Sequence, residues 1–210
     1  MKVAARSSPL SIAQIHEIET LLKTPLTPIL VKTHGDIDQK TSLRTLDKTD
    51  FFTREVDELV LSGQADFAIH SAKDLPATLP DGLTIAHITP SIDPRDALIL
   101  RPDKHLPQNA LIGSSSPRRD LALKAYRPDL VPTDIRGTIE QRLSQLDRLH
   151  GVIIAEAALI RLKLTHLPRI YLSGDTTPLQ GCLAIVTRQG FNSLKSTIFF
   201  DRLKVNTEGL

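Results

Sequence analysis

An ammonium and a carboxylate group lie side by side in the segment ADFAIHSAKDLP, residues 65–76. Residues 65–70 are mostly apolar and are bounded by a glycine and a proline, which predicts a buried strand of a sheet covered on both faces. Ser71, Lys73 and Asp74 follow this strand, and open α/β sheets bind ligands at the carboxyl ends of their strands. A surface Lys–Asp pair that closes a turn is the alternative.

Basic and hydroxyl side chains recur where predicted strands end and predicted helices begin. Arg6 and Ser8 separate a strand at residues 2–5 from a helix that starts at Pro9, with Ser8 as its N-cap. The segment GSSSPRR, residues 113–119, repeats this order with three hydroxyls, a helix N-terminus and two guanidiniums. Such groups attract carboxylates or phosphates, so we expect a ligand with several negative groups.

Two more arginines belong to a further predicted helix. Arg136 precedes it, Thr138 and Gln141 fit a capping box, and Arg142 is not needed for its apolar face. Each arginine taken singly is typical of a solvated surface, but clustering near strand-to-helix junctions favours binding. Asp74 would be the one carboxylate among these cations, suited to hold N–H donors or to stabilise a developing positive charge.

Composition excludes several classes of function. The 210 residues carry a net charge of +2 with 4% aromatic residues and no Trp, so neither a basic stripe nor stacking rings for nucleic acid are present. No apolar run predicts a membrane span or a signal peptide, which indicates a cytoplasmic protein. The seven His residues and Cys182 show no metal-ligand spacing, and Cys182 fits a small buried strand residue.

The predicted elements make an α/β chain of two domains with a cleft and two hinge crossings. Pattern breaks near residues 93 and 177 divide it into a discontinuous first domain, a second domain and a tail. Residues 37–49 are polar and without periodicity, which predicts a mobile loop over the site. The domains are expected at residues 1–92 with 177–199 and at 93–176, and the strands at 2–5, 28–32, 65–70, 83–88, 110–113, 131–135, 151–155 and 183–186.

Five segments in order, RSSPLSIAQ, HSAKDLP, DPRDAL, GSSSPRR and DIRGTIEQRL, resemble the signature segments of the porphobilinogen deaminase (hydroxymethylbilane synthase) family. The resemblance runs from about residue 2 to 188. It implies two domains of periplasmic-binding-protein-like type and a transferase that condenses four porphobilinogens into a linear tetrapyrrole with loss of ammonia. It also implies a dipyrromethane cofactor that primes the chain.

The resemblance also assigns roles to residues. Asp74 would hydrogen-bond the pyrrole nitrogens and stabilise the cationic azafulvene formed when ammonia leaves, and Phe52 would cover the site. Gln14, Ala155, Gln180 and Gly181 would line the cleft. The carboxylates of cofactor and growing chain would be bound by Arg6, Ser8, Ser71, Lys73, Ser114, Ser115, Ser116, Arg118, Arg119, Arg136, Arg142 and Arg161.

Three features depart from the family pattern. Thr45 and Thr49 stand where the family's loop carries lysines, with Asp47, Lys48 and Asp50 nearby. The third domain that holds the cofactor through a cysteine thioether is expected to be absent, with residues 200–210 as a tail. No attachment site for the cofactor is found in the sequence.

Three functions therefore remain open at the level of sequence. They are a reduced two-domain porphobilinogen deaminase, a non-catalytic descendant that binds a pyrrole or tetrapyrrole, and a module for a small organic anion. The last gains nothing from Asp74 among arginines, so Asp74 favours pyrrole chemistry. We expect a monomer that binds the small molecule porphobilinogen, with neither nucleic acid nor membrane as partner.

Overall fold

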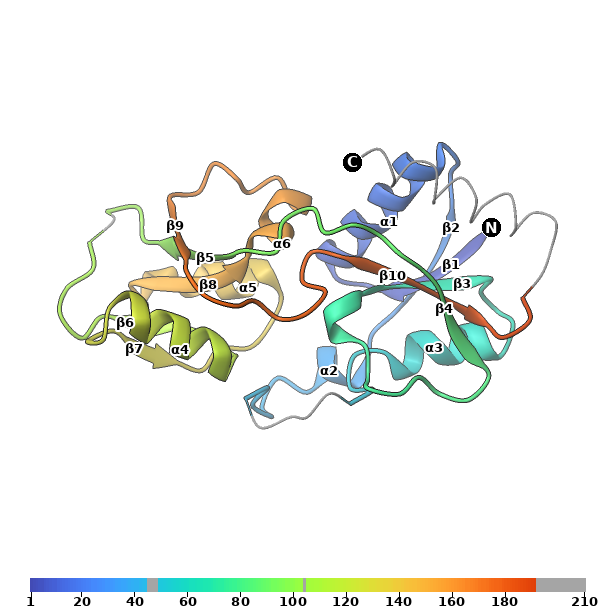
Figure 1. Ribbon diagram of the computed structural model, residues 1–210, viewed down its shortest axis with the longest axis horizontal. Coiled ribbons are helices and arrows are strands. Elements are labelled where there is room, and N and C mark those ends of the chain that lie inside the picture. The colour runs from blue at the N-terminus through green and yellow to red at the C-terminus, as the bar shows by residue number, and fades with distance from the viewer. Residues whose placement is uncertain (45–48, 104, 192–210) are drawn as a thin grey trace. The chain divides into compact units, whose positions relative to one another are not determined.

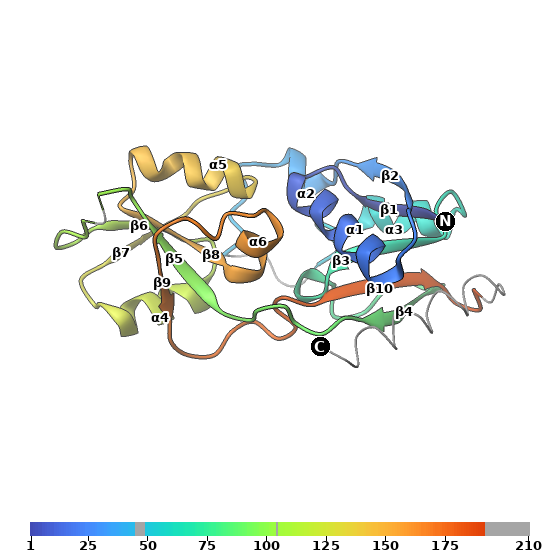
Figure 2. The same ribbon diagram turned by 90° about the horizontal axis from the view of Figure 1, so that it is seen from above.

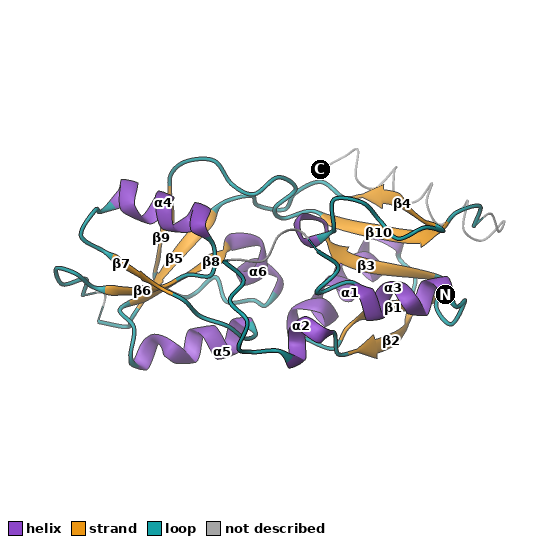
Figure 3. Cartoon of the chain, turned by 90° about the horizontal axis from the view of Figure 1, so that it is seen from below, coloured by secondary structure: helices purple, strands orange, loops and turns teal. Residues whose placement is uncertain are grey.

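The computed structural model describes residues 1–44, 49–103 and 105–191, which form two compact α/β units. Of the described residues, unit 1 contains 1–37, 49–92 and 181–191, and unit 2 contains 38–44, 93–103 and 105–180. Each unit has its own five-stranded sheet (Figure 1). The chain enters unit 2 briefly at residues 38–44, crosses to it again after the fourth strand along the sequence, and returns to unit 1 before the tenth (Figure 3).

Unit 1 is built on a mixed sheet with the strand order β2-β1-β3-β10-β4. Its strands are β1 (Lys2–Arg6), β2 (Thr27–Val31), β3 (Phe67–Ser71), β4 (Leu83–Ile88) and β10 (Leu183–Arg188). β1 runs parallel to β2 and β3, whereas β10 is antiparallel to β3 and β4. The carboxyl ends of β1 and β3 therefore share one edge of the sheet, and β10 begins at that edge.

Alternating side chains of this sheet face two apolar layers. The helices are α1 (Pro9–Leu22), α2 (His34–Ile37), α3 (Arg54–Leu61) and the 3-10 turn η1 (Ala72–Asp74). On one face Phe67 and Ile69 of β3 pack with α1, and on the other Ala68 packs with Val56 and Val60 of α3. Figure 1 shows α1 and α3 on opposite sides of the sheet. Burial on both faces explains why the apolar run of β3 was recognisable in the sequence.

Unit 2 repeats this plan with the strand order β7-β6-β8-β5-β9. Its strands are β5 (Asp96–Leu100), β6 (Leu111–Gly113), β7 (Val131–Thr133), β8 (Gly151–Ala155) and β9 (Arg169–Leu172). Its helices are α4 (Pro117–Tyr126), α5 (Ile139–Leu143), η2 (Ser144–Asp147) and α6 (Glu156–Arg161), with α4 and α5 on opposite sides of the strands (Figure 2). β6 is parallel to β7 and β8, and β5 is antiparallel to β8 and β9.

Two strands of unit 2 were not predicted. β5 starts inside the segment that the sequence analysis interpreted only as a domain crossing, yet all five of its residues are buried between β8 and β9. β9 is an edge strand with mostly half-buried residues, so its sequence carries little periodicity. Long-range pairing, which local sequence does not encode, creates both strands.

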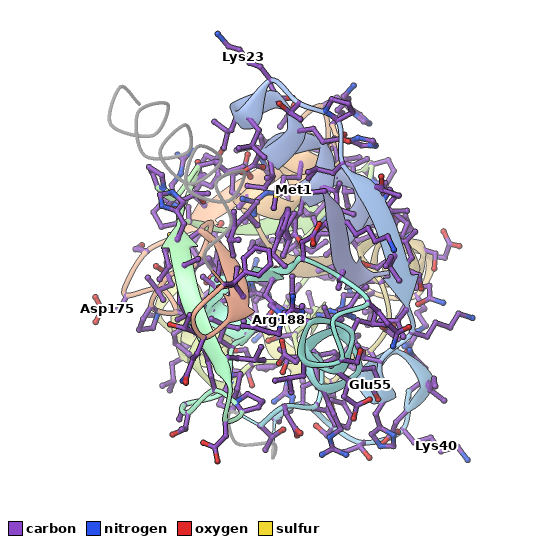
Figure 4. The ribbon with its side chains drawn as sticks, turned by 90° about the vertical axis from the view of Figure 1, so that its right-hand side faces the viewer. Met1, Lys23, Lys40, Glu55, Asp175 and Arg188 are labelled. Atoms are coloured by element: carbon purple, nitrogen blue, oxygen red, sulfur yellow. The ribbon has the colours of Figure 1, made fainter. Side chains whose placement is uncertain are left out.

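Of the predicted mobile loop at residues 37–49, the structure describes 37–44 and 49; Ile37 ends α2, and residues 38–44 lie outside helices and strands, as a loop does. Its mobility stays a prediction. Residues 34–37 form α2, and Ser42 and Arg44 bind acidic side chains of unit 2. Thr45, Asp47 and Lys48 lie outside the described residues. Lys40 points away from the surrounding chain, and Figure 4 shows its ammonium in solvent.

The described residues contain neither a membrane-spanning helix nor a cluster of metal ligands. No helix there is long and apolar enough to cross a membrane. No group of three or more His, Cys, Asp or Glu side chains in the same part of the chain could hold a metal ion.

Candidate active site

The first strand-to-helix junction of unit 1 has the predicted cap. Ser8 is the N-cap of α1, its Oγ accepts a hydrogen bond from the Ser11 amide at 3.2 Å, and Pro9 occupies the first turn. The Ser8 and Ser11 hydroxyls lie 2.9 Å apart. The two hydroxyls thus stand at the end of β1, where the amide groups of α1 begin.

Arg6, the last residue of β1, is held by a carboxylate. Its guanidinium forms an ion pair with Asp36, with Nε 3.2 Å from Oδ2, and lies 4.6 Å from the ring centroid of Phe52. Asp36 also accepts hydrogen bonds from the amide and hydroxyl of Thr33. Burial acts to raise the pKa of Asp36, but these donors outweigh it and hold that pKa below 3.8. The sequence analysis missed Asp36.

The segment of residues 65–76 lies at the same edge of the sheet, where β1 and β3 end. Ser71 is the last residue of β3 and not, as expected, a residue beyond it, and its Oγ accepts a hydrogen bond from Gln14 of α1 at 2.8 Å. Lys73 and Asp74 follow in η1, Lys73 half-buried and Asp74 exposed. The carboxylate of Asp74 is therefore accessible to a ligand.

A buried hydrogen-bonded pair of side chains lies directly before this segment. His70 of β3 and Asp57 of α3 are 4% and 1% exposed, with Nε2 2.9 Å from Oδ1. The pair ties the end of β3 to α3, directly before Ser71 and η1. Asp57 sits one turn into an amphipathic helix, and no spacing rule in the sequence connects it to His70.

In unit 2 the arginines of GSSSPRR surround an acidic residue. Asp96 begins β5 at the edge where β6 and β8 end, opposite Ala155 in the register. Arg118 and Arg119 of α4 both form ion pairs with Asp96, and Gln180 donates a hydrogen bond to it at 3.0 Å. The expectation that the cations have Asp74 as their one carboxylate is wrong, because Asp96 and Asp36 each pair with them.

A second cluster forms around α5. Thr138 and Gln141 make the predicted capping box, and Arg142 donates from Nε to the Gly137 carbonyl at 2.9 Å and from Nη1 to Ser115 Oγ at 2.6 Å. Ser114 is fully buried, and its Oγ lies 3.4 Å from the Ser116 amide. A hydroxyl and a guanidinium, Ser115 and Arg142, are thus brought into contact from two junctions.

Segment 38–44 lies against this part of unit 2. Arg136 donates from Nη2 to the Asp38 carbonyl at 2.6 Å. Arg44 forms an ion pair with Asp120 of α4 and donates to the Ser114 carbonyl at 3.0 Å. Sequence reasoning missed Arg44, since a lone arginine in a polar stretch gives no periodic or motif signal.

The other predicted site residues lie at element ends. Ala155 ends β8, Arg161 ends α6 in a half-buried position, and Gly181 precedes β10 with φ of 87°. Cys182 is 8% exposed, which confirms the predicted burial, but it directly precedes β10 and is not, as expected, part of a strand. Its carbonyl accepts a hydrogen bond from the Ala72 amide at 3.0 Å.

Comparison with known proteins identifies the family. The family model described as porphobilinogen deaminase, dipyromethane cofactor binding domain, matches residues 1–196. The chain belongs to the porphobilinogen deaminase family. This confirms the family predicted from the five motifs, and membership implies a transferase of tetrapyrrole biosynthesis.

Two relatives show the extent of the similarity. The probable porphobilinogen deaminase of Chlamydia muridarum (strain MoPn / Nigg) is 42% identical over 198 residues, which are 89% of this chain and 81% of the relative. The porphobilinogen deaminase of Clostridioides difficile (strain 630) is 34% identical over 210 residues, 93% of this chain and 70% of the relative.

Solved structures support the predicted fold class. The methionine binding protein MetQ aligns with a TM-score of 0.56 at 13% identity, over 97% of this chain and 89% of MetQ. The regulatory domain of an OxyR2 mutant from Vibrio vulnificus aligns with a TM-score of 0.54 at 16% identity, over 100% and 95%. At these identities the likeness concerns the fold alone, and it confirms the binding-protein-like α/β architecture.

The donors present fit the cofactor named by the family model. A dipyrromethane presents carboxylates and pyrrole N–H groups. Arg142 with Ser115 supplies a cationic and a hydroxyl donor for carboxylates, and the exposed carboxylate of Asp74 can accept N–H groups. Both kinds of partner are thus available at the predicted positions.

Proposed function

We propose that this chain is a porphobilinogen deaminase, condensing four porphobilinogen molecules into the linear tetrapyrrole hydroxymethylbilane with release of ammonia. The observation that carries the proposal is the position of Asp74. It is an exposed carboxylate in η1, the turn that directly follows β3 of unit 1, inside a segment typical of the family.

Asp74 is proposed as the catalytic residue. Loss of ammonia from porphobilinogen leaves positive charge on the pyrrole, and a carboxylate beside the pyrrole nitrogen stabilises that charge. The hydrogen bond from Gln14 to Ser71 and the buried pair of His70 and Asp57 fix the end of β3, and so fix the start of η1. Pre-organisation of this kind avoids reorganisation when the charge develops.

The substrate's acetate and propionate groups account for the cations. We assign their binding to Arg6, Ser8, Ser71 and Lys73 in unit 1 and to a set of hydroxyls and guanidiniums in unit 2. Charge-assisted hydrogen bonds are stronger than neutral ones and orient the pyrrole ring. Gln14, Phe52, Gln180, Gly181 and Ala155 would line or cover the site. The unit 2 set is Ser114, Ser115, Ser116, Arg118, Arg119, Arg136, Arg142 and Arg161.

The dipyrromethane cofactor would lie against the same donors. When bound, it supplies the pyrrole carbon that accepts the first substrate unit. Arg142 and Ser115 would hold a carboxylate of it, and Asp74 would accept its pyrrole N–H groups.

Further parts of the proposal concern the organisation of the protein. Residues 1–92 with 177–199 and residues 93–176 would be two domains joined by hinge crossings near 93 and 177. The protein would act in the cytoplasm as a monomer, with porphobilinogen as a small-molecule partner and with neither nucleic acid nor a membrane.

A binding-only role is the second candidate, and the burial of Cys182 favours it. Cys182 is the single thiol of the 210 residues and is 8% exposed. Buried thiols are poor nucleophiles, because the reactive form is the thiolate. Such a protein would bind a pyrrole or tetrapyrrole without turnover.

A turnover assay separates the two candidates. Purified protein is incubated with porphobilinogen, and consumption of substrate, release of ammonia and formation of linear tetrapyrrole or its cyclised product are followed. The enzyme proposal predicts all three signals above a no-protein control. Saturable binding of porphobilinogen by calorimetry without product would instead establish the binding-only role.

A further inference from the structure

Asp96 is a buried carboxylate whose role no motif assigned. It is 1% exposed at the start of β5, a strand with hydrogen-bonded neighbours on both sides. A carboxylate removed from water in a sheet costs several kcal/mol unless cations and donors compensate it. The neighbours of Asp96 therefore have to supply this compensation.

Three side chains converge on Asp96 from two parts of unit 2. Arg119 approaches Oδ1 with Nε at 3.0 Å and Nη2 at 2.8 Å, and Arg118 binds Oδ2 through Nη2. Gln180 Nε2 lies 3.0 Å from Oδ1 and also donates to the Pro94 carbonyl at 2.7 Å. Burial acts to raise the pKa of Asp96, yet the two guanidiniums and the Gln180 amide hold it below 3.8.

The two arginines are fixed beyond this carboxylate as well. Arg119 donates to the Ile153 carbonyl at 3.4 Å, and its side chain is 10% exposed. Arg118 is 27% exposed and donates to the Asp175 carbonyl at 2.7 Å. Each long side chain is thus held in one arrangement before any ligand arrives.

Charge counting shows that the cluster still attracts anions. Two guanidiniums and one carboxylate leave a net charge of +1. Arg118 keeps a partly exposed guanidinium next to the hydroxyl-rich start of α4. Side-chain entropy, about 0.5–1.5 kcal/mol for each immobilised side chain, is lost on folding and not on binding.

We propose that Asp96 is a positioning residue that orients Arg118 and Arg119 to bind a carboxylate of the pyrrole ligand. The role rests on the proposed function for the identity of the ligand. Asp96 restrains the two guanidiniums whatever the ligand is, so this restraint can be measured without any ligand.

The first experiment measures that step by modifying guanidiniums with phenylglyoxal and mapping the modified peptides by mass spectrometry. Asp96→Asn removes the charge that holds Arg118, so Arg118 is expected to react several-fold faster than in the parent protein, with the native fold retained in circular dichroism. Asp129→Asn is the matched control, because Asp129 pairs with Arg127 in the same unit, so only Arg127 should change. An unchanged rate at Arg118 in a folded Asp96→Asn protein overturns the proposal.

The second experiment reads the consequence for the ligand. KM for porphobilinogen is expected to rise about 10-fold or more in Asp96→Asn, the effect of losing one charge-assisted contact, with a smaller change in kcat. Asp96→Glu keeps the charge but shifts both guanidiniums, so its KM should lie between those of the parent and the Asn variant. Should Asp96→Asn not fold, a parent-like KM in Asp96→Glu overturns the positioning role.

The two failures are distinguishable. A parent protein that neither converts nor binds porphobilinogen contradicts the proposed function, and the role of Asp96 toward a pyrrole ligand falls with it. A parent protein that converts porphobilinogen, with Asp96→Asn kinetics equal to it, contradicts the positioning role alone.

Discussion

In both units, arginine side chains of the candidate site are held by acidic partners. Arg6 is paired with Asp36, and Arg118 and Arg119 share Asp96. Asp74 differs from both carboxylates because it is exposed, in the turn η1 that follows β3. Paired carboxylates orient guanidiniums for binding, whereas an accessible one can meet positive charge that develops on a substrate.

Replacement of Asp74 by Asn tests this distinction at a single atom. The amide keeps the shape but loses the charge that stabilises the cationic pyrrole, so kcat is expected to fall about 100-fold or more with an unchanged unfolding midpoint. Asp81→Asn, an exposed position in the same unit, is the control and should retain parent activity. Near-parent turnover by Asp74→Asn would remove Asp74 from the mechanism.

Arg142 offers a test of carboxylate binding. Its guanidinium contacts Ser115 Oγ at 2.6 Å, and the residue is half-buried in the last turn of α5. Arg142→Leu should weaken porphobilinogen binding by about 1.5–3 kcal/mol, measured by calorimetry, because one charge-assisted contact is lost. Added salt should weaken binding in the parent more than in the variant.

The exposed Arg148 is a matched control for Arg142. It ends the turn after η2 and hydrogen-bonds only to Gln145 among the contacts that the structure describes. Arg148→Leu should bind porphobilinogen as the parent does. Equal affinity in Arg142→Leu and the parent would refute the assignment of Arg142.

Covalent attachment of a cofactor to these 210 residues through a thioether would have to use Cys182, their single thiol. Thioether formation needs a reachable thiolate, and this thiol is 8% exposed. Protein produced in a host that makes porphobilinogen is therefore expected to show its unmodified mass in denaturing mass spectrometry. An adduct of dipyrromethane mass that maps to Cys182 would contradict this expectation.

At the scale of elements, the junctions were predictable and the strand partners were not. The caps at Ser8 and Thr138 follow from residues within one helical turn, so local sequence specifies them. β5 depends on pairing with β8 and β9, which lie more than 50 residues away. In the sequence, this segment shows only an apolar run that follows Pro94. Nothing in that run identifies its partner strands.

The same difference separates predicted from missed site residues. Asp74, Ser115 and Arg142 belong to local motifs and were found. Asp36 and Asp96 act through partners 30 and 22 residues away in sequence, so their roles appear only in the folded chain. Local motifs are enough to propose residues for ligand binding, whereas the carboxylates that pair with the arginines are found only from the tertiary structure.

The helix α2 positions Phe52 through a close approach at Gly35. A Cβ atom at Gly35 would overlap the ring of Phe52 and lie 2.7 Å from Cδ1 of Phe51. Gly35→Ala is therefore expected to cost about 1–3 kcal/mol in unfolding free energy, measured by urea denaturation. It should also move Phe52 away from Arg6, which lies 4.6 Å from the ring centroid.

A second substitution checks that mechanism. Phe52→Leu removes ring atoms that the new Cβ would meet, so the double variant should recover part of the stability lost in Gly35→Ala. Strictly additive losses would show that the Phe52 ring is not the cause.

At the scale of the whole molecule, each unit carries its own core and, beside arginines of the candidate site, a carboxylate whose pKa is lowered. The cores around Phe67 in unit 1 and around Ile153 in unit 2 consist of separate sets of residues. Asp36 belongs to unit 1 and Asp96 to unit 2. The contributions of these carboxylates to stability should therefore add.

Acid should destabilise both units through these two groups. Because the pKa values of Asp36 and Asp96 are lowered below 3.8 in the folded protein, each carboxylate contributes stability that is complete well above pH 4. That contribution is lost as the pH falls from about 4 through the lowered pKa values, since the unfolded chain then binds more protons. Urea denaturation at pH values from 7 to 3, in steps of about one pH unit, measures this loss of unfolding free energy.

Charge-removing variants assign the effect to residues. Asp36→Asn and Asp96→Asn should each be less stable than the parent at pH 7 and lose less stability between pH 5 and about pH 3, because the group that titrates is gone. The double variant should show the sum of the two changes, and Asp81→Asn should follow the parent. A parent-like acid profile in both single variants would mean that neither ion pair of the folded state contributes to stability, leaving the two carboxylates as orienting groups for the arginines alone.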